Sequence, residues 1–224
     1  MRCKGNKIYR HNLELFKKID VFCTICSILS NINICFMINR IAIFASGSGS
    51  NAENIINFFA QDSRFLFPII ISNKEDAYIH TRAKNLGVPS VTFSKEQFLD
   101  GSDILSLLSV HNINAIVLAG FLLKVPDGII RAYSDKIINI HPALLPKFGG
   151  KGMYGNHVHK AVVAAQEAES GITIHYVNEH YDEGNIIFQA KCEVLPTDTF
   201  EDLAHKIHAL EYEHFPKVIE TLWG

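Results

Sequence analysis

The sequence is poor in the features that mark several protein classes. Only five of its 224 residues are cysteine, and four of them, Cys3, Cys23, Cys26 and Cys35, come before residue 38. Because Cys192 alone remains for the rest of the chain, no disulfide framework is possible there, and we expect a reducing, cytoplasmic compartment. An excess of positive charge is also missing, since 21 basic residues face 23 acidic ones. This balance argues against a dedicated nucleic-acid-binding protein.

Long uninterrupted apolar runs are absent as well. The most apolar stretch, residues 21–38, is broken by serine and asparagine, and no small-residue cleavage site follows it. We therefore predict neither a spanning helix nor a signal peptide. Residues 1–38 carry six basic and two acidic residues, and both this charge bias and the cysteine content change near Met37. We predict that residues 1–36 are a non-essential extension, consistent with an upstream start codon, and that residues 37–224 form the catalytic domain.

The spacings of cysteine and histidine give only weak indications of a metal site. A Cys-x-x-Cys pair occurs once, within the first 38 residues, but no second pair or flanking histidine completes a site, so we interpret it as coincidence. Among eleven histidines, His157 and His159 lie two apart and His205 and His208 three apart, but no His-Glu-x-x-His motif is present. We predict no bound metal.

What the sequence does have is alternation of strand-like and helix-like segments. With 48% hydrophobic and 20% charged residues, the composition is that of an ordinary globular protein. The expected strands are 41–46, 67–72, 88–93, 115–120, 136–140, 171–178 and 185–195, and the expected helical segments are 51–61, 76–87, 95–112, 157–168 and 199–222. The pattern predicts an α/β fold, a doubly wound, mostly parallel sheet with an antiparallel C-terminal portion and a long C-terminal helix, bent at Pro216. Such sheets bind ligands at the carboxyl ends of their strands.

The first chemical motif is SGSGSNA at residues 46–52, between the first strand and the first helix. Glycines let the backbone approach an anion, and the amides of Gly49, Ser50 and Asn51 at a helix N-terminus supply donors and a favourable dipole. The motif predicts a site for one phosphate. The alternative is a tight turn that merely starts a helix.

A dinucleotide site is the rival interpretation, because the motif also has the Gly-x-Gly-x-x-Ala spacing, starting at Gly47. That site needs an acidic residue at the end of the second strand to hold a ribose. The second strand here ends before Asn73, and Glu75 and Asp76 come later, near the next helix. We therefore favour a small phosphomonoester over a dinucleotide.

Two polar side chains share a strand end. Asn139 and His141 flank Ile140 at the end of the strand KIINI, and alternation along a strand puts both on one face. An amide and an imidazole side by side at the active edge of a sheet are typical of a site that stabilises an oxyanion. Taken singly, each has an ordinary structural explanation, and the loop 178–185 by itself would be a plain turn.

Together these segments resemble a known family. The motifs SGSGSN, LAGF, NIHPALLPKFGGKGMYG and HYDEGNIIFQ, in this order from about Met37 to the C-terminus, are similar to those of phosphoribosylglycinamide formyltransferases, folate-dependent enzymes of de novo purine synthesis. The resemblance implies a Rossmann-like formyltransferase fold and 10-formyltetrahydrofolate as co-substrate. It covers none of residues 1–36.

The resemblance also implies roles for particular residues. The matched catalytic residues are Asn139, His141 and Asp182. The matched phosphoribosylglycinamide-binding residues are Gly49, Ser50, Asn51, His208 and Glu211. The matched folate-binding residues are Leu122, Leu123, Lys124, Val125, Asn139, Asn178, Glu179, His180, Tyr181 and Asp182. Two positions depart from the family, since His208 replaces a frequent lysine and Leu123 a frequent arginine. We expect His159 and His175 to support the active edge, assisted by Thr173.

The residues suit this chemistry. Formyl transfer to an amine passes through a tetrahedral carbon that bears an oxyanion, while one proton leaves the amine and another reaches the departing nitrogen. We expect Asn139 and protonated His141 to donate to that oxygen, and Asp182 to orient His141 and relay protons through water. Neither a metal nor a covalent nucleophile is required.

Related enzymes with similar chemistry must be distinguished from this interpretation. Methionyl-tRNA formyltransferase and formyltetrahydrofolate hydrolase resemble this core but carry an additional domain, for which we expect no room here. A catalytically silent nucleotide- or folate-binding module would tolerate loss of the polar trio, which is present. We expect small-molecule substrates, no nucleic-acid or membrane partner, and a monomer or weak homodimer.

Overall fold

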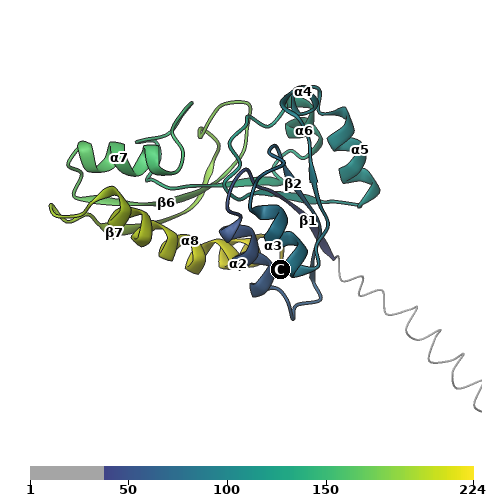
Figure 1. Ribbon diagram of the computed structural model, residues 1–224, viewed down its shortest axis with the longest axis horizontal. Coiled ribbons are helices and arrows are strands. Elements are labelled where there is room, and N and C mark those ends of the chain that lie inside the picture. Colours follow the sequence, from purple (N-terminus) through teal and green to yellow (C-terminus); the bar gives the residue numbers. More distant parts are fainter. Residues whose placement is uncertain (1–37) are drawn as a thin grey trace, which may run out of the picture. The chain divides into compact units, whose positions relative to one another are not determined.

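The computed structural model describes residues 38–224, which form one seven-stranded sheet flanked by helices (Figure 1). The strand order across the sheet is β3-β2-β1-β4-β5-β6-β7. The strands are β1 (Asn39–Phe44), β2 (Phe65–Ser72), β3 (Ser90–Thr92), β4 (Ala115–Leu118), β5 (Ile137–His141), β6 (Glu169–Tyr176) and β7 (Ile186–Glu193). The order reverses at β1, so the first crossovers run outward on both sides of it, as in other doubly wound folds.

The pairing confirms a mixed sheet. Strands β1 to β5 pair in parallel, whereas β6 is antiparallel to β5 and β7 is antiparallel to β6. A short connection can join antiparallel strands but not parallel ones. The close spacing of the last two strands in the sequence therefore dictates their antiparallel pairing.

Helices cover both faces of the sheet. They are α2 (Ser50–Phe58), α3 (Ile79–Leu86), α4 (Lys95–Asp100), α5 (Ser102–Val110), α6 (Asp127–Ala132), α7 (Asn156–Ala164) and α8 (Phe200–Trp223). One hydrophobic core lies under α2, α3, α7 and α8, and the other under α4, α5 and α6. The predicted fold class, with its long C-terminal helix, is confirmed.

Alternation along β1 explains how one strand serves both cores. Ile41, Ile43 and Ala45 belong to the first core, and Ala42 and Phe44 to the second. All five are fully buried, because a strand in the middle of a parallel sheet has helices over both faces. This is why the segment appears in the sequence as a continuous apolar run.

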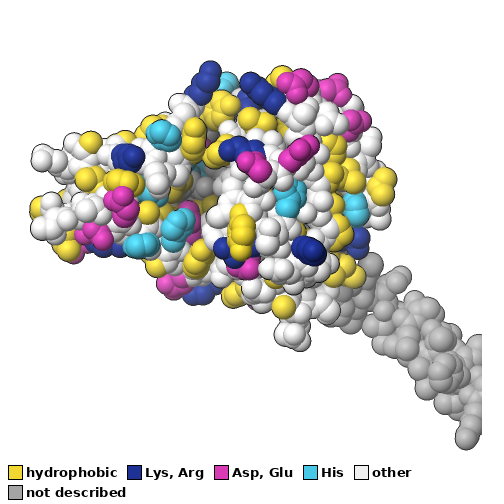
Figure 2. Space-filling view, in the orientation of Figure 1, with side chains coloured by type: hydrophobic (Ala, Val, Ile, Leu, Met, Phe, Trp, Pro, Cys, Tyr) yellow, Lys and Arg dark blue, Asp and Glu magenta, His cyan; other side chains and the backbone are white. Residues whose placement is uncertain are grey.

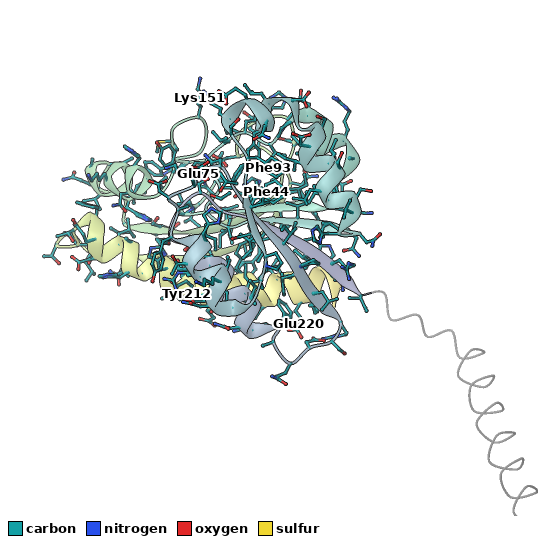
Figure 3. The ribbon with its side chains drawn as sticks, turned by 45° about the vertical axis from the view of Figure 1, so that its right-hand side comes forward. Phe44, Glu75, Phe93, Lys151, Tyr212 and Glu220 are labelled. Carbon is teal, nitrogen blue, oxygen red and sulfur yellow. The ribbon has the colours of Figure 1, made fainter. Side chains whose placement is uncertain are left out.

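Aromatic rings fill the centre of the second core. Phe44 makes edge contacts with Phe98 and Phe121, with ring centroids 6.1 and 5.4 Å apart, a geometry that aromatic pairs prefer. Figure 3 shows Phe44 and Phe93 near each other in the interior of the domain, at the ends of β1 and β3. This packing gives the strand ends a rigid base.

Apart from shifts of up to three residues at helix ends, the helices differ from the expectation in three places. The segment expected over residues 95–112 is two helices, because Gly101 adopts a left-handed conformation with φ of 73° and ends α4. Helix α6 was not predicted, since its six residues carry too short a pattern to recognise. Helix α7 ends at Ala164, four residues before the expected end at residue 168.

Helix α8 continues through Pro216. Proline has no N–H, so the carbonyl four residues earlier, on Tyr212, loses its helical donor. Asn54 of α2 replaces that donor, because its side-chain Nδ2 donates to the Tyr212 carbonyl at 2.9 Å. The bend expected at Pro216 stays a prediction, but the proline has a clear effect, which is to tie α8 to α2.

The predicted extension, residues 1–36, and its Cys23 and Cys26 lie outside the described residues, so their interpretation stays a prediction. Within residues 38–224, none of the helices is both long enough and apolar enough to cross a bilayer.

Candidate active site

A cavity of about 470 Å³ opens at the carboxyl ends of β1, β4 and β5, which is the edge where the fold predicts a ligand. Its volume is typical of small-molecule sites, about 300–1,000 Å³. Residues 47–51, 118–125 and 139–142 line it, with further residues from the loops before α7 and after β6 and from α8. Figure 2 shows histidine side chains at the surface over α7 and α8, with acidic and basic side chains intermixed on that face.

Asn139 is oriented by its neighbour on the next strand. The antiparallel register puts Asn139 beside His175, and Asn139 Nδ2 donates to His175 Nε2 at 3.1 Å. His175 Nδ1 donates to the Tyr176 carbonyl at 2.8 Å, so Nε2 is left as an acceptor. Burial lowers the pKa of His175, which keeps the ring neutral and able to accept. The amide nitrogen of Asn139 has a second hydrogen, which is free for a ligand in the cavity.

His141 is held with one nitrogen committed and the other free. The residue is 3% exposed, and its Nε2 donates to the Phe148 carbonyl at 2.8 Å. Its Nδ1 faces Asp182, with Oδ2 at 3.6 Å. That separation is too long for a hydrogen bond, so Nδ1 is the nitrogen available to exchange a proton with a ligand.

Asp182 connects three parts of the site. Its Oδ2 accepts from the Gly150 N–H at 2.8 Å, and its Oδ1 lies 3.7 Å from His175 Nε2. The residue has a φ of 57°, a left-handed conformation that is uncommon outside glycine and that clusters at functional sites. The turn after β6 therefore holds the carboxylate between the two imidazoles.

The predicted phosphate loop has its glycine for a reason that the sequence does not reveal. Gly49 precedes α2 with a φ of 74°, and a Cβ built there would lie 2.8 Å from the Cβ of Ile79 on α3. Glycine is required because the backbone is left-handed and because α3 is close. The added side chain would point at α3, not at an anion in the cavity.

Ser46 ties this loop to the opposite wall of the cavity. Its hydroxyl accepts from the Leu122 N–H at 2.9 Å, and its N–H donates to the Gly120 carbonyl at 3.0 Å. The same hydroxyl donates to Asn73, the residue at the position where a dinucleotide site would need an acidic side chain. The loop 46–51 and the segment 118–125 are thus held in fixed relation.

A buried carboxylate on α8 organises the substrate-side wall. Glu211 is 5% exposed, and its Oε2 accepts from Asn51 Nδ2 and from His208 Nδ1, each at 2.9 Å. The hydrogen bond to Glu211 raises the pKa of His208. The predicted substrate residues from α2 and α8, which are 160 positions apart in the sequence at Asn51 and Glu211, are therefore in direct contact.

His159 lies in the same cavity wall, buried, with no hydrogen-bond partner for Nδ1. Burial lowers its pKa. Thr173 is fully buried and does not line the cavity. It donates to the Ala143 carbonyl at 2.7 Å and accepts from the Leu145 N–H at 3.0 Å. The threonine therefore supports the loop that follows His141, and its assistance to His159 and His175 stays a prediction.

The structure brings nearly all of the predicted folate residues to one cavity. The four residues 122–125 line it, as do Asn178, His180 and Tyr181. Glu179 is exposed and is not among the lining residues. The turn geometry explains this difference, because neighbouring residues of a tight loop point in different directions.

Sequence reasoning missed a complete segment of the wall. Residues 150–156 line the cavity, and this loop supplies the Gly150 N–H to Asp182. Its glycine-rich composition was visible in the sequence. That composition indicates only that the backbone can adopt many conformations, and not where the loop lies. Figure 3 shows Lys151 of this loop at the periphery of the domain.

Among residues 38–224, no group of three or more histidine, cysteine, aspartate or glutamate side chains is arranged to hold a metal ion. The polar side chains in the cavity are instead bonded to one another or face a ligand space.

The comparisons with known proteins agree with this geometry. A family model described as formyl transferase matches residues 39–219. The chain is 39% identical over 188 residues to the chloroplastic phosphoribosylglycinamide formyltransferase of Vigna unguiculata, covering 82% of this chain and 60% of the relative. It is 35% identical over 190 residues to the phosphoribosylglycinamide formyltransferase of Bacillus subtilis, covering 83% of this chain and 95% of that one.

Solved structures are also similar. Glycinamide ribonucleotide transformylase 1 from Geobacillus kaustophilus has a TM-score of 0.77 and 33% identity, over 84% of this chain and 100% of that one. The chain spans 60% and 65% of the length of the two plant relatives and nearly all of the Bacillus subtilis relative.

Proposed function

The chain belongs to the formyl transferase family, and from that premise we propose that it transfers the formyl group of 10-formyltetrahydrofolate to the amine of 5-phosphoribosylglycinamide. One observation carries the proposal. Asn139, His141 and Asp182 meet in one cavity, between a loop suited to a phosphate and a wall of apolar and backbone groups. The product is formylglycinamide ribonucleotide, an intermediate of purine synthesis.

The reaction exchanges one C–N bond for another. The reduced folate supplies an electrophilic formyl carbon on N10. The substrate amine attacks that carbon and loses a proton, and the bond to N10 breaks as N10 gains one. Negative charge develops on the formyl oxygen in between, so donors fixed beforehand in a site of low water content lower the barrier most.

The three polar residues divide this work. Asn139 offers the amide hydrogen that His175 leaves free. His141 offers Nδ1, because its Nε2 is committed to Phe148. Asp182 faces His141 Nδ1 at 3.6 Å, close enough to stabilise the protonated ring and, through a water molecule, to accept the proton from the amine.

The two ends of the cavity suit the two substrates. At one end, backbone amides of residues 49–51 begin α2 and would hold the phosphate, while Glu211 would accept from ribose hydroxyls. At the other end, Leu122 and Val125 contribute an apolar wall, which suits the flat ring system of a folate. No residue of this proposal requires a metal.

The direct test is a formyl-transfer assay with phosphoribosylglycinamide and 10-formyltetrahydrofolate. We expect formylglycinamide ribonucleotide and tetrahydrofolate to form in equal amounts, and release of formate to be slow. Formate release that does not depend on phosphoribosylglycinamide would favour a hydrolase instead. Absence of both products, with folate still bound, would favour a catalytically silent module.

His208 predicts a pH dependence of substrate affinity. Because its pKa is raised by Glu211, the ring keeps its positive charge to a higher pH than a free imidazole and loses it as the pH rises through that value. A half-exposed charge of this kind contributes about 1 kcal/mol at most to the free energy of substrate binding. We therefore expect the KM for phosphoribosylglycinamide to rise by up to about fivefold across this pH range.

The control for this prediction is His208→Lys, which stays charged throughout. Because titration of the substrate affects both proteins equally, the difference between the two KM profiles isolates His208. Parallel profiles would show that the charge of His208 does not contribute to binding of phosphoribosylglycinamide.

Three further proposals rest on the sequence and the relatives. We propose residues 37–224 as the catalytic unit, which contains the matched range 39–219. We propose a cytoplasmic location, from the cysteine usage. We also propose that the partners are small molecules, without nucleic acid or membrane, and that the protein is a monomer or a weak homodimer.

A further inference from the structure

Helix α3 lies beside α2 and touches the phosphate loop without lining the cavity (Figure 1). Three successive carbonyls of the loop are bonded. The Gly47 carbonyl accepts from the Ile79 N–H at 3.1 Å, the Ser48 carbonyl accepts from Arg82 Nε at 2.9 Å, and the Gly49 carbonyl accepts from the Glu53 N–H at 3.0 Å. Two of the three donors belong to α3.

These bonds determine where the loop's N–H groups point. In a trans peptide unit the C=O and the following N–H point in opposite directions. The carbonyl of Ser48 points to Arg82, so the N–H of Gly49 points away from α3. The carbonyl of Gly49 points along α2, so the N–H of Ser50 is also free of an internal partner. A peptide flip at Ser48 would present an oxygen, which repels an anion, in place of a donor.

The surroundings of Arg82 hold its guanidinium at the Ser48 carbonyl. Its guanidinium forms an ion pair with Glu53 in the first turn of α2, and it lies over the ring of Tyr78 at 5.2 Å. Its side chain is 25% exposed. A planar guanidinium can serve the Ser48 carbonyl and the Glu53 carboxylate together, whereas a lysine ammonium on a flexible chain matches that fork less well.

We propose that Arg82 is a positioning residue for the phosphate loop, fixing the Ser48–Gly49 peptide so that the Gly49 N–H faces the substrate phosphate. This inference rests on the proposed function, because it assumes that the loop binds phosphoribosylglycinamide. Arg82 itself does not touch the substrate. It acts through the orientation of a peptide group. Its loss should therefore change the KM for the phosphate-bearing substrate alone.

The test compares Arg82→Met with Arg82→Lys. Methionine keeps an apolar stem over Tyr78 and loses every donor, and lysine keeps the charge. We expect Arg82→Met to raise the KM for phosphoribosylglycinamide by about tenfold, because a small misplacement of binding groups is costly. We expect kcat and the KM for the folate to change less than about twofold, and Arg82→Lys to recover only part of the loss. Full recovery by lysine would overturn the proposal, because charge alone would then explain the effect.

Glu53→Gln is the matched control, since it removes the charge of the ion pair and leaves the bond from Arg82 to Ser48 possible. We expect its KM to stay within about twofold of wild type. A loss as large as that of Arg82→Met would show that the ion pair, not the carbonyl contact, matters, and would overturn the proposal.

Hydrogen exchange of the peptide that spans residues 46–52, measured without substrate, separates this inference from the proposed function. Faster exchange in Arg82→Met than in Glu53→Gln is expected if Arg82 holds the loop, whether or not wild-type protein transfers formyl groups. Unchanged exchange together with unchanged KM would overturn the positioning role, even if formyl transfer is established.

Discussion

His141→Ala is expected to lower kcat by about a hundred- to a thousandfold, the usual cost of losing a fixed donor to a developing oxyanion. The imidazole is buried, with Nε2 bonded to the Phe148 carbonyl and Nδ1 turned to Asp182, so its loss leaves Asn139 as the remaining side chain assigned to the oxyanion. Because the residue acts on the charge that develops during reaction, the KM values for both substrates should change little. Steady-state kinetics with each substrate varied in turn measures both quantities.

His205→Ala is the matched control, because His205 lies exposed on α8 and does not line the cavity. It should keep the wild-type kcat. Thermal unfolding of both variants checks that His141→Ala is folded. If folded His141→Ala retained more than about a tenth of kcat, the residue would contribute less than about 1.4 kcal/mol and would not be the main oxyanion donor.

Gly49→Val is expected to raise the KM for phosphoribosylglycinamide by at least about tenfold, with the KM for the folate nearly unchanged. A β-branched residue resists the left-handed φ of 74°, and its Cβ would meet Ile79, so the loop must move. Each hydrogen bond to a charged group that is lost costs about 1.5–3 kcal/mol, and 1.36 kcal/mol is already tenfold. Measuring both KM values distinguishes a local from a general effect.

Gly87→Val controls for backbone strain. Gly87 also has a left-handed φ, of 69°, but a Cβ there meets nothing within 4 Å, and it ends α3 away from the cavity. It should lower thermal stability and leave both KM values near wild type. An equal rise of the KM for phosphoribosylglycinamide in both variants would mean that strain anywhere in the domain impairs binding. The Gly49→Val result would then be no evidence that this loop binds the phosphate.

Binding of NAD to wild-type protein in the micromolar range, abolished in Gly49→Val, would instead support the dinucleotide interpretation of the glycine motif. The position of Asn73, bonded to Ser46 at the end of β2, makes this outcome unexpected, because no carboxylate is present there to hold a ribose.

Local patterns were enough to predict most of the fold. Alternating apolar strands and helices, with a short link between the last two strands, require a mixed sheet with helices on both faces. Patterns failed where local chemistry is ambiguous. Gly101 separates α4 from α5, although a glycine in a helical pattern is often tolerated, and the six residues of α6 are too few to show a period.

The candidate site was predictable to the extent that its residues lie on strands or directly after them. Asn139 and His141 could be paired from the two-residue period of β5. Residues 150–156 could not be assigned a position, because a glycine-rich loop has no period, and only the structure brings them to Asp182.

The sequence by itself determined the class of fold, the edge of the sheet that carries the chemistry, and the residue types available there, because these depend on periodicity and on intrinsic side-chain properties. Only the tertiary structure decided which nitrogen of His141 is free, that Asn139 is oriented by His175, and that Arg82 holds the Ser48 carbonyl. The contacts of Asn139 and Arg82 join residues on neighbouring strands or far apart in the chain, and that of His141 reaches into the loop that follows its own strand. Their directions follow from the register of β5 against β6 and from the packing of α3 on the phosphate loop, which no local pattern encodes.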